Sequence, residues 1–507
     1  MQIELVRPEA ETLLEAMRAM GYSVGTALAD LIDNSISARA TRVSVTFRDR
    51  RICEPYLAVL DNGRGMSRHE LIEAMRHGSR HSTEPRGEHD LGRFGLGMKT
   101  ASQSQCRALT VISLRADTSE IVGARWDLDF LKKERDWNLQ VFTEADLLDE
   151  SCQIPASELK ELRESGHGTL VLWQRLDRLT AGLKDDREAL TNRICETASH
   201  LGLVFHRFLE GSAPQKIELL LNGKPILPSD PFLGRSSSIW EIGAENITVP
   251  DGFGGEAIVT VEACVMPSMK KLDEAQLAQL AGNEGLRKGQ GFYVYRAHRL
   301  VVWGTWFRMV RQEELTKLAR IKVNIPNSLD HLWSLDIRKS AAMPPEVVRE
   351  RLRSVVDRVK DGAKRVTTFA GRVRMVADAL WTERSLNDKM FQFMVNRQHP
   401  LLKSLREQVD ESTAVEIDRY LTALELALPY TQIYALMAGD RRVSAGDEVD
   451  EQLALQFLPL AQNVFRLLVD EGISHQNALD QLVGMEPFCL RPSMIPIILK
   501  TLPQRTV

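Results

Sequence analysis

The stretch LGRFGLGMKTASQ, residues 91–103, contains three glycines followed by a lysine and a threonine. Its Gly92 and Gly97 have the spacing of the phosphate-binding sequence G-x-x-x-x-G-K-[ST], but Met98 separates the second glycine from Lys99. A loop of that type also follows a strand, whereas here a polar segment without apolar periodicity comes first. The stretch therefore predicts a different anion site, in which glycine N–H groups and the beginning of a helix face a phosphate.

Length and composition are those of an ordinary globular protein. The 507 residues exceed what one hydrophobic core organises, so about two to four domains are expected. The net charge of −4 gives no general attraction to nucleic acids or membranes. The six cysteines are scattered without a C-x-x-C pair, which indicates reduced thiols and neither a disulfide framework nor a zinc site. With no signal peptide and no apolar run of about 18 residues, the sequence predicts a cytoplasmic protein without a membrane segment.

Changes of pattern along the chain divide it into three parts. Helical and strand-like signals alternate over residues 1–210, strand-like runs dominate residues 211–345, and leucine-rich helical periods fill residues 346–507. We therefore expect the α/β fold class, with an N-terminal α/β domain, a second α/β domain and a helical C-terminal region. The C-terminal helices carry no recognisable chemistry, and a role in dimerisation or partner docking is expected for them.

The stretch ALADLIDNSISA, residues 27–38, predicts a helix on which Asp30 and Asn34 lie one turn apart and point the same way. A carboxylate and a carboxamide oxygen placed like this can share a water molecule and a hard cation. The carboxylate of Asp30 can orient or deprotonate the water, while the amide oxygen of Asn34 can bind Mg²⁺. The alternative is that both side chains belong to the polar face of an amphipathic helix.

The stretch LDNGRGMS, residues 60–67, follows a short apolar run that predicts a buried strand. A carboxylate at the end of such a strand, Asp61, can accept a hydrogen bond from the exocyclic amine of adenine. Gly63 and Gly65 leave the backbone free to approach a flat ligand. The alternative is a glycine turn between two elements, for which the tripeptide Asp-Asn-Gly is typical.

In this order, DLIDN, LDNGRGM, GRFGLGMKTAS and the strand-like HGTLVL resemble the motifs of the GHKL ATPase superfamily, which includes gyrase, heat-shock chaperones, histidine kinases and MutL. The resemblance implies a Bergerat-type α/β sandwich at the N-terminus, ATP and Mg²⁺ as cofactors, and a mobile lid over His77–Gly97. It implies Asp30 as the catalytic base, Asn34 as the metal ligand, and a hydroxyl of Thr169 that reaches adenine directly or through water. The implied nucleotide-binding set is Asn34, Asp61, Gly63, Gly65, Met66, Gly92, Phe94, Gly95, Leu96, Gly97, Met98, Lys99 and Thr169.

One residue departs from the pattern of the superfamily. The usual catalytic base is a glutamate, and Asp30 is shorter than glutamate by one methylene group. We therefore expect an ATP hydrolase with slow turnover. The alternative is a nucleotide-gated binding or signalling module that hydrolyses little ATP.

The resemblance also implies a role for the second α/β domain. The first motif begins about thirty residues into the chain, which leaves no room for the dimerisation helices that precede the ATPase domain of histidine kinases. In gyrase, MutL and the chaperones a transducer domain follows and sends a basic residue to the γ-phosphate. Lys339 in the sequence DIRKS is the catalytic residue predicted here, with Arg338 second. The alternative is an Arg-Lys pair on the surface.

The sequences GRFGLGMKTAS and GFYVYRAHRLVVWGTW are similar to those of MORC-like ATPases, including bacterial relatives. That resemblance implies a nucleotide-gated clamp in which ATP binding pairs two N-terminal domains into a homodimer. Met1–Met20 is a candidate for an arm exchanged between the two chains, and the alternative is an ordinary capping helix. It suggests a role in DNA transactions, or in prokaryotic phage defence and restriction. DNA and a nuclease or other defence-system protein are then the partners considered, and no membrane partner is expected. A chaperone-like ATPase for protein clients is the alternative.

Several basic residues interleave with aromatic residues between positions 295 and 311. Such a pattern can bind DNA phosphates and stack on bases. The simpler interpretation is a set of core aromatic residues with solvated arginines between them. The basic residues are Arg296, His298, Arg299, Arg308 and Arg311.

Overall fold

The computed structural model divides into two compact units, residues 1–367 and residues 368–507. The domain boundaries predicted at residues 210 and 345 stay a prediction. The structure describes residues 4, 8–19, 21–48, 54–78, 91, 97–118, 120–179, 187–234, 240–267, 271–282, 285–313, 316–333, 343–369, 379–387, 390–433, 450–490 and 494–501.

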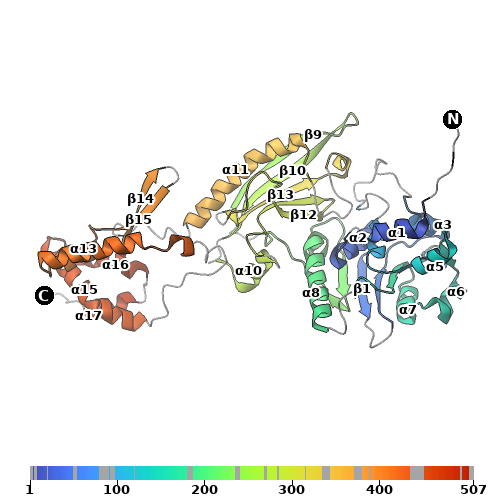
Figure 1. Ribbon diagram of the computed structural model, residues 1–507, viewed down its shortest axis with the longest axis horizontal. Helices are drawn as coiled ribbons and strands as arrows, with labels where there is room; N and C mark the ends of the chain where they lie inside the picture. Colours follow the sequence, from blue (N-terminus) through green and yellow to red (C-terminus); the bar gives the residue numbers. More distant parts are fainter. Residues whose placement is uncertain are drawn as a thin grey trace. The chain divides into compact units, whose positions relative to one another are not determined.

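The first unit contains a sheet of eight strands in the order β5-β4-β3-β6-β2-β1-β7-β8 (Figure 1). Neighbouring strands are antiparallel except for β1 and β7, which are parallel. The strands are β1 (Arg42–Arg48), β2 (Tyr56–Asp61), β3 (Ala108–Leu114), β4 (Ile121–Asp127), β5 (Gln140–Phe142), β6 (Gly168–Gln174), β7 (Glu218–Leu221) and β8 (Lys224–Pro225).

Helices cover both faces of this sheet, so alternate residues of a strand enter different cores. Val43, Val45 and Val59 pack against most of the helices, whereas Tyr56 and Leu60 pack against α6 and α7. The helices on the first face are α1 (Ala10–Arg18), α2 (Val24–Ser37), α3 (Arg68–Met75), α4 (Gly97–Gln103), α5 (Leu128–Glu134), α8 (Arg187–Val204) and α9 (His206–Glu210). Those on the second face are α6 (Glu144–Leu148) and α7 (Ala156–Ser165). The predicted N-terminal α/β sandwich is confirmed.

A second sheet in the same unit has five strands in the order β12-β11-β13-β10-β9. The strands are β9 (Trp240–Pro250), β10 (Glu256–Val265), β11 (Gly291–Arg296), β12 (Arg299–Thr305) and β13 (Ala319–Ile325), and α10 (Glu274–Ala281) lies between β10 and β11 in the chain. The long helix α11 (Glu346–Phe369) runs along this sheet and buries Val348, Leu352, Val355 and Val359 in the core that it shares with the strands (Figure 1). Their spacing of three and four residues is that of one helix face. The predicted second α/β domain is confirmed.

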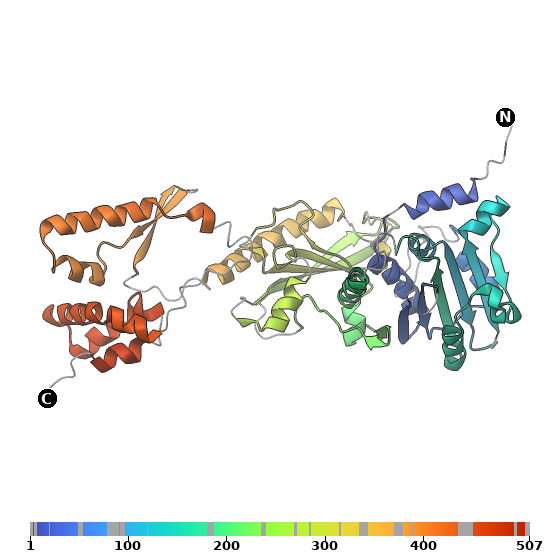
Figure 2. The ribbon, with the colours of Figure 1, turned by 60° about the horizontal axis from the view of Figure 1, so that its bottom comes forward.

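The second unit is mostly helical, as predicted, and its described residues include a hairpin that the sequence pattern did not indicate. Strands β14 (Trp381–Asn387) and β15 (Met390–Val395) are antiparallel, and β15 lies beside α13 (Figure 2). The core of the unit comes mainly from α15 and α16. The helices are α12 (Pro400–Arg406), α13 (Glu411–Leu426), α15 (Asp450–Asp470), α16 (His475–Gly484) and α17 (Ile495–Thr501). Among the described helices of the whole chain, none has the length and apolar character that crossing a membrane requires.

Candidate functional site

Helix α2 carries the first group of predicted site residues. It begins after Ser23, whose hydroxyl oxygen accepts the N–H of Thr26 at 3.2 Å and so caps the helix. Asp30 is 4% exposed. Its Oδ2 accepts the hydroxyl of Tyr22 at 3.2 Å. Asn34, one turn later, is exposed. The predicted helix is confirmed, with a buried, oriented carboxylate followed by an amide that is open to solvent.

Asp61 ends strand β2 and lies against α2. Its Oδ2 accepts the hydroxyl of Ser35 and its Oδ1 accepts the N–H of Gly63, both at 2.8 Å. Burial raises the pKa of the Asp61 carboxyl, although both hydrogen bonds act to lower it. Ser35 is among the buried residues of α2, and no motif indicated its contact with Asp61. A hydroxyl on a buried helix face is a signal that a polar partner lies opposite.

Strand β6 brings Thr169 beside Asp61, because the two residues are paired in the antiparallel register of β2 and β6. The hydroxyl of Thr169 lies 3.1 Å from that of Ser113 on β3. The Ser113 hydroxyl also accepts the N–H of Met66 at 2.8 Å and donates to the carbonyl of Gly168 at 3.0 Å. Asp61, Met66 and Thr169 are therefore close together, as the motifs predicted, and Ser113 is a connecting residue that no motif indicated.

Close backbone packing explains two of the glycines in this region. Gly65 has φ +70°, and a Cβ atom there would lie 2.1 Å from the carbonyl oxygen of Leu114. Gly168 has φ +141°, and its Cβ atom would lie 2.0 Å from the carbonyl oxygen of Asp61. No side chain fits at either position, so contacts within the protein already require glycine. That Gly65 also lets a ligand approach the backbone stays a prediction.

Helix α4 begins beside the carboxylate of Asp30, since a Cβ atom on Gly97 would lie 3.3 Å from Asp30 Oδ2. Met98 is half-buried and packs against the core of the domain. Lys99 is 2% exposed, and its Nζ donates to the carbonyl of Ala74 at 2.8 Å. Burial lowers the pKa of Lys99 to about 8. In this structure the Lys99 ammonium is thus bound to the end of α3, and its predicted phosphate contact stays a prediction.

Part of the predicted site lies outside the described residues. This applies to Gly92, Phe94, Gly95, Leu96, Arg338 and Lys339, and to most of the predicted lid. Leu91 is described and is 1% exposed. Its N–H donates to the hydroxyl oxygen of Ser37 at 3.3 Å, which joins the start of the glycine stretch to the end of α2.

Two arginines of the basic and aromatic segment are buried ion-pair partners, so neither interpretation given above for them is correct. Arg299 Nε lies 2.8 Å from Asp33 Oδ1, and its Nη2 lies 3.8 Å from Asp30 Oδ1. Arg296 binds both carboxylate oxygens of Asp330, at 2.7 and 2.6 Å. Arg296 is 3% exposed and Arg299 is 5% exposed. They are neither solvated nor available to DNA phosphates.

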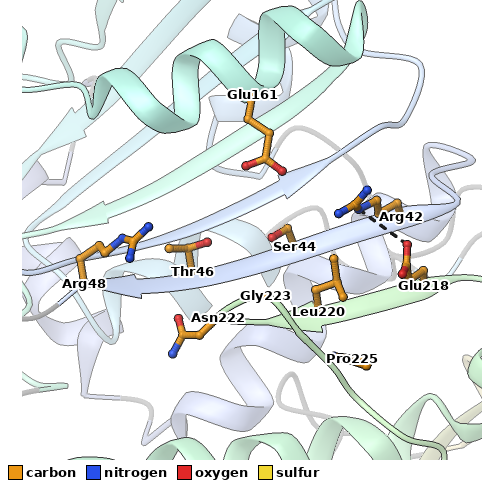
Figure 3. A pocket seen from close by; sticks show the side chains of 10 residues that line it. All are labelled: Arg42, Ser44, Thr46, Arg48, Glu161, Glu218, Leu220, Asn222, Gly223 and Pro225. Atoms are coloured by element: carbon orange, nitrogen blue, oxygen red, sulfur yellow. Dashed lines mark ion pairs between the residues drawn. The ribbon is translucent and has the colours of Figure 1, made fainter.

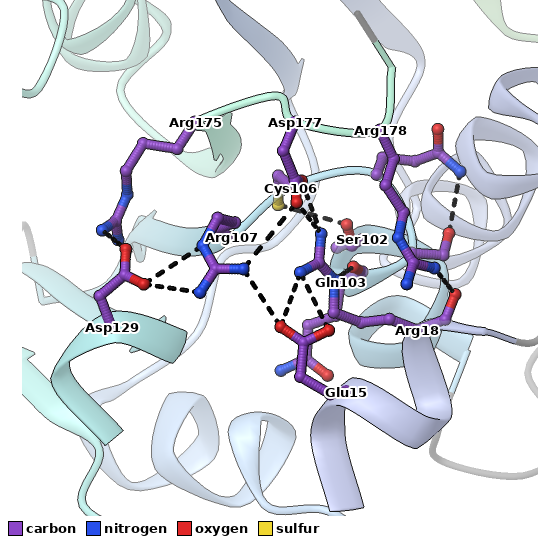
Figure 4. Close-up of polar contacts among 12 residues, drawn as sticks. Glu15, Arg18, Ser102, Gln103, Cys106, Arg107, Asp129, Arg175, Asp177 and Arg178 are labelled. Carbon is purple, nitrogen blue, oxygen red and sulfur yellow. Dashed lines mark hydrogen bonds and ion pairs between the residues drawn. The ribbon is translucent and has the colours of Figure 1, made fainter. Parts of the chain in front are cut away.

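A network of charged residues holds α1 on its own domain (Figure 4). Arg18 is 1% exposed; its Nη2 binds both carboxylate oxygens of Asp177 at 2.6 and 2.7 Å, and its Nε donates to the carbonyl of Gln103 at 2.8 Å. Arg107 continues the network, with Nη1 3.1 Å from Glu15 and Nη2 2.6 Å from Asp129. The described part of the candidate arm is therefore fixed to the end of α4.

A polar groove of about 530 Å³ lies on the face of the eight-stranded sheet that α6 and α7 cover (Figure 3). Ser44 and Thr46 of β1 face it, because the alternating Val43 and Val45 enter the core beneath α2. Its lining residues are Arg42, Ser44, Thr46, Arg48, Glu161, Glu218, Leu220, Asn222, Gly223 and Pro225. The groove contains none of the predicted site residues. In the described part of the chain, no three His, Cys, Asp or Glu side chains come together as a metal site.

Comparison with known proteins agrees with the four motifs. The family model described as histidine kinase-, DNA gyrase B-, and HSP90-like ATPase matches residues 22–169, which include Asp30, Asn34, Asp61 and Thr169. Among curated proteins no relative matches. Among solved structures, the ATPase and transducer domains of DNA topoisomerase II from Balamuthia mandrillaris are similar at 13% identity and a TM-score of 0.36, over 69% of this chain and 86% of that chain. Residues 22–169 therefore belong to the histidine kinase-, DNA gyrase B- and HSP90-like ATPases, that is, to the GHKL superfamily.

Proposed function

We propose that this chain binds ATP together with Mg²⁺ and hydrolyses it slowly. The observation that carries the proposal is the buried carboxylate of Asp61, held by Ser35 and Gly63 and paired with Thr169, beside the helix that bears Asp30 and Asn34. The match of residues 22–169 to a family model of ATPases supports it.

Adenine is the base that Asp61 fits. The carboxylate of Asp61 accepts hydrogen bonds from Ser35 and Gly63, and an ionised carboxylate has lone-pair capacity for a further donor. The exocyclic amine of adenine is such a donor, whereas the carbonyl at the same position of guanine would face a buried carboxylate. A charge-assisted hydrogen bond of this kind contributes about 1.5–3 kcal/mol. The neighbouring Thr169 hydroxyl can orient the ring directly or through a water molecule.

The phosphate side of the site is proposed for α2 and the residues after Leu91. Asn34 is exposed one turn beyond Asp30, so its amide oxygen can bind the magnesium ion of Mg-ATP. The ion would neutralise phosphate charge and offset the charge that develops during hydrolysis. Asp30 is proposed to orient and deprotonate the attacking water. Lys99, Lys339 and the glycines of the stretch 92–97 are proposed as phosphate contacts.

A second function from another class is a nucleotide-gated module with little hydrolysis. The observation that favours it is that Asp30 is shorter than the usual glutamate and already has Tyr22 and Arg299 beside its two oxygens. A base held in this way reaches a water molecule only from a restricted position.

We further propose a dimeric clamp, closed by ATP, that acts in DNA transactions or in phage defence of the MORC-like kind. Domains at 1–210, 211–345 and 346–507, a cytoplasmic location, and a nuclease or other defence partner belong to this proposal. The C-terminal unit supplies a surface that suits docking, since α13 buries none of its residues. On it Tyr420 is 66% exposed and Leu426 85% exposed.

The binding proposal is tested by titrating the 507-residue chain with ATP and with GTP, each with and without Mg²⁺. Selective binding of ATP that tightens with Mg²⁺ is expected. Asn34→Ala should remove most of the effect of Mg²⁺ and leave weak binding of ATP alone. Equal binding of ATP and GTP would overturn the adenine assignment. Sedimentation with a non-hydrolysable ATP analogue tests the clamp, which predicts a dimer in that state.

A further inference from the structure

The turn between β11 and β12 contacts the nucleotide-binding domain at two of its motifs. Ala297 and His298 have φ +44° and +69°, as in a tight hairpin turn, and they bring Arg296 and Arg299 to the same end of the hairpin. From there one arginine contacts α2 and the other contacts the residue that precedes the glycines. The second sheet therefore contacts both α2 and Leu91 through a single turn.

Arg299 lies between two acidic residues of α2. Asp30 and Asp33 are 4% and 1% exposed, and they lie on neighbouring turns of the helix. Two buried carboxylates repel each other, and removing either from water is costly unless a cation is near. The guanidinium of Arg299 supplies that cation, with Nε 2.8 Å from Asp33 and Nη2 3.8 Å from Asp30. The closer contact anchors the helix, and the longer one reaches Oδ1 of Asp30, whereas Tyr22 donates to Oδ2.

The surroundings of Arg299 leave it little freedom to move. Its guanidinium carbon lies 5.8 Å from the centre of the Phe205 ring. The His200 ring packs at 5.7 Å from that of Trp303 on the same strand. The positive charge of Arg299 adds to burial in lowering the pKa of His200 to about 4, so the histidine beside it is neutral near pH 7. Arg299 is thus the cation that faces α2 from β12, among aromatic rings and an uncharged histidine.

Arg296 makes the other contact. Two of its nitrogens bind Asp330, which fixes the guanidinium plane. The third nitrogen, Nη1, donates to the carbonyl of Leu91 at 3.1 Å. Leu91 is the residue immediately before the proposed phosphate-binding glycines, so this bond fixes where that stretch begins.

We propose that Arg299 is a positioning residue that fixes the Asp30 carboxylate through its pairing with Asp33 and Asp30. With Arg296, it makes the β11–β12 hairpin the link by which the second sheet sets the geometry of the ATP site. The inference rests on the proposed function, because Asp30 is taken as the base. It goes beyond that function by assigning a contribution to hydrolysis to a strand outside the matched family domain.

Kinetics of ATP hydrolysis by the 507-residue chain test the role of Arg299. Arg299→Met should lower kcat about ten- to a hundredfold and leave KM for ATP within about threefold, because the base is misplaced while the adenine contacts remain. Arg299→Lys should lower kcat less than Arg299→Met does, because the ammonium group keeps the positive charge. Some loss of kcat should remain, because one ammonium group cannot span two carboxylates. The matched control is Arg351→Met, which removes an exposed arginine from α11 and should leave both constants unchanged.

Arg296→Lys tests the second contact. It should raise KM for ATP more than it lowers kcat, because Leu91 borders the phosphate side and does not carry the base. An unchanged KM for ATP would show that Arg296 does not help the β11–β12 hairpin to set the geometry of the ATP site.

A double-mutant cycle in nucleotide-free protein supplies a readout that does not depend on turnover. Unfolding is measured for wild type, Arg299→Lys, Asp33→Asn and the double variant. The effects should not add, because each single change breaks the same ion pair. Additive effects, or a wild-type kcat in Arg299→Met, overturn the inference while the proposed function stands. Absence of ATP binding and hydrolysis in wild type would instead overturn the proposed function, whatever the cycle gives.

Discussion

The carboxylate of Asp61 and the hydroxyl of Ser35 are joined by a 2.8 Å hydrogen bond inside the domain. This bond connects the end of β2 with the helix that carries Asp30 and Asn34, so the adenine side and the phosphate side of the proposed site share one rigid contact. Ser35 is 3% exposed and Asp61 is 6% exposed, which keeps the bond shielded from competing water.

Asp61→Asn should separate binding from stability. Asparagine has nearly the same shape, and its amide can still accept from Gly63 and donate to the Ser35 oxygen, so the fold is preserved. It also removes a buried carboxylate whose pKa is raised by burial, so the unfolding midpoint at pH 7 should not fall. ATP binding should drop at least about tenfold, measured by titration, because the amide NH₂ faces the adenine amine. Retained affinity would show that Asp61 does not bind the base.

Gly168→Ala should destabilise the protein by more than about 2 kcal/mol, because the new methyl group would overlap the carbonyl of Asp61 and the backbone is in a region unfavourable for alanine. The matched control is Gly166→Ala. That glycine also has a positive φ, of +75°, but no atom lies within 4 Å of its Cβ position, so only about 1 kcal/mol should be lost. Denaturant unfolding of both variants measures the difference. Equal losses of stability in the two variants would contradict the close contact between the backbone of β6 and the carbonyl of Asp61.

Arg18→Met should destabilise the domain by roughly 2 kcal/mol, because it leaves Asp177 and the carbonyl of Gln103 without their buried donor. The loss is limited because Asp177 is 37% exposed and can be hydrated. Arg163→Met, which breaks an exposed pair with Glu144, should cost at most about 1 kcal/mol. Chemical unfolding compares the two. A similar small loss in both would show that α1 is not held by Arg18.

Acidification should destabilise the protein between about pH 6.5 and pH 4 through two histidines. Burial, followed by the charge of Lys99, lowers the pKa of His77 to about 4, and burial with Arg299 does the same for His200. Unfolded histidine titrates near 6.5, so in this window the unfolded chain binds more protons than the folded one and stability falls as pH falls. The unfolding midpoint of His77→Gln/His200→Gln should vary less across the window than that of wild type. His69→Gln, at an exposed position, should keep the wild-type slope.

Local patterns were sufficient for the elements that carry the site. The helical spacing of Asp30 and Asn34 and the position of Asp61 at the end of an apolar run were readable, because each depends on a few adjacent residues. Ser113 could not be predicted, since its role depends on which strands become neighbours of β3. The burial of Arg296 and Arg299 was missed for a related reason.

Long-range ion pairing explains that miss. An arginine between aromatic residues looks the same in sequence whether it is solvated or paired with an acid far away in the chain, and Asp30 and Asp33 are far from Arg299 in sequence. The hairpin of β14 and β15 was missed because its residues, WTERSLN and MFQFMV, are short runs within a region of helical pattern.

The most direct test of the central claim is the rate of phosphate release from ATP by wild-type protein and by Asp30→Asn, with Mg²⁺ and with ATP affinity measured on the same samples. The account predicts slow hydrolysis by wild type that depends on Mg²⁺. It predicts a loss of at least about a hundredfold in Asp30→Asn at nearly unchanged ATP affinity. Equal rates in the two proteins, at the background level or above it, would contradict the assignment of Asp30 as the base of an ATPase.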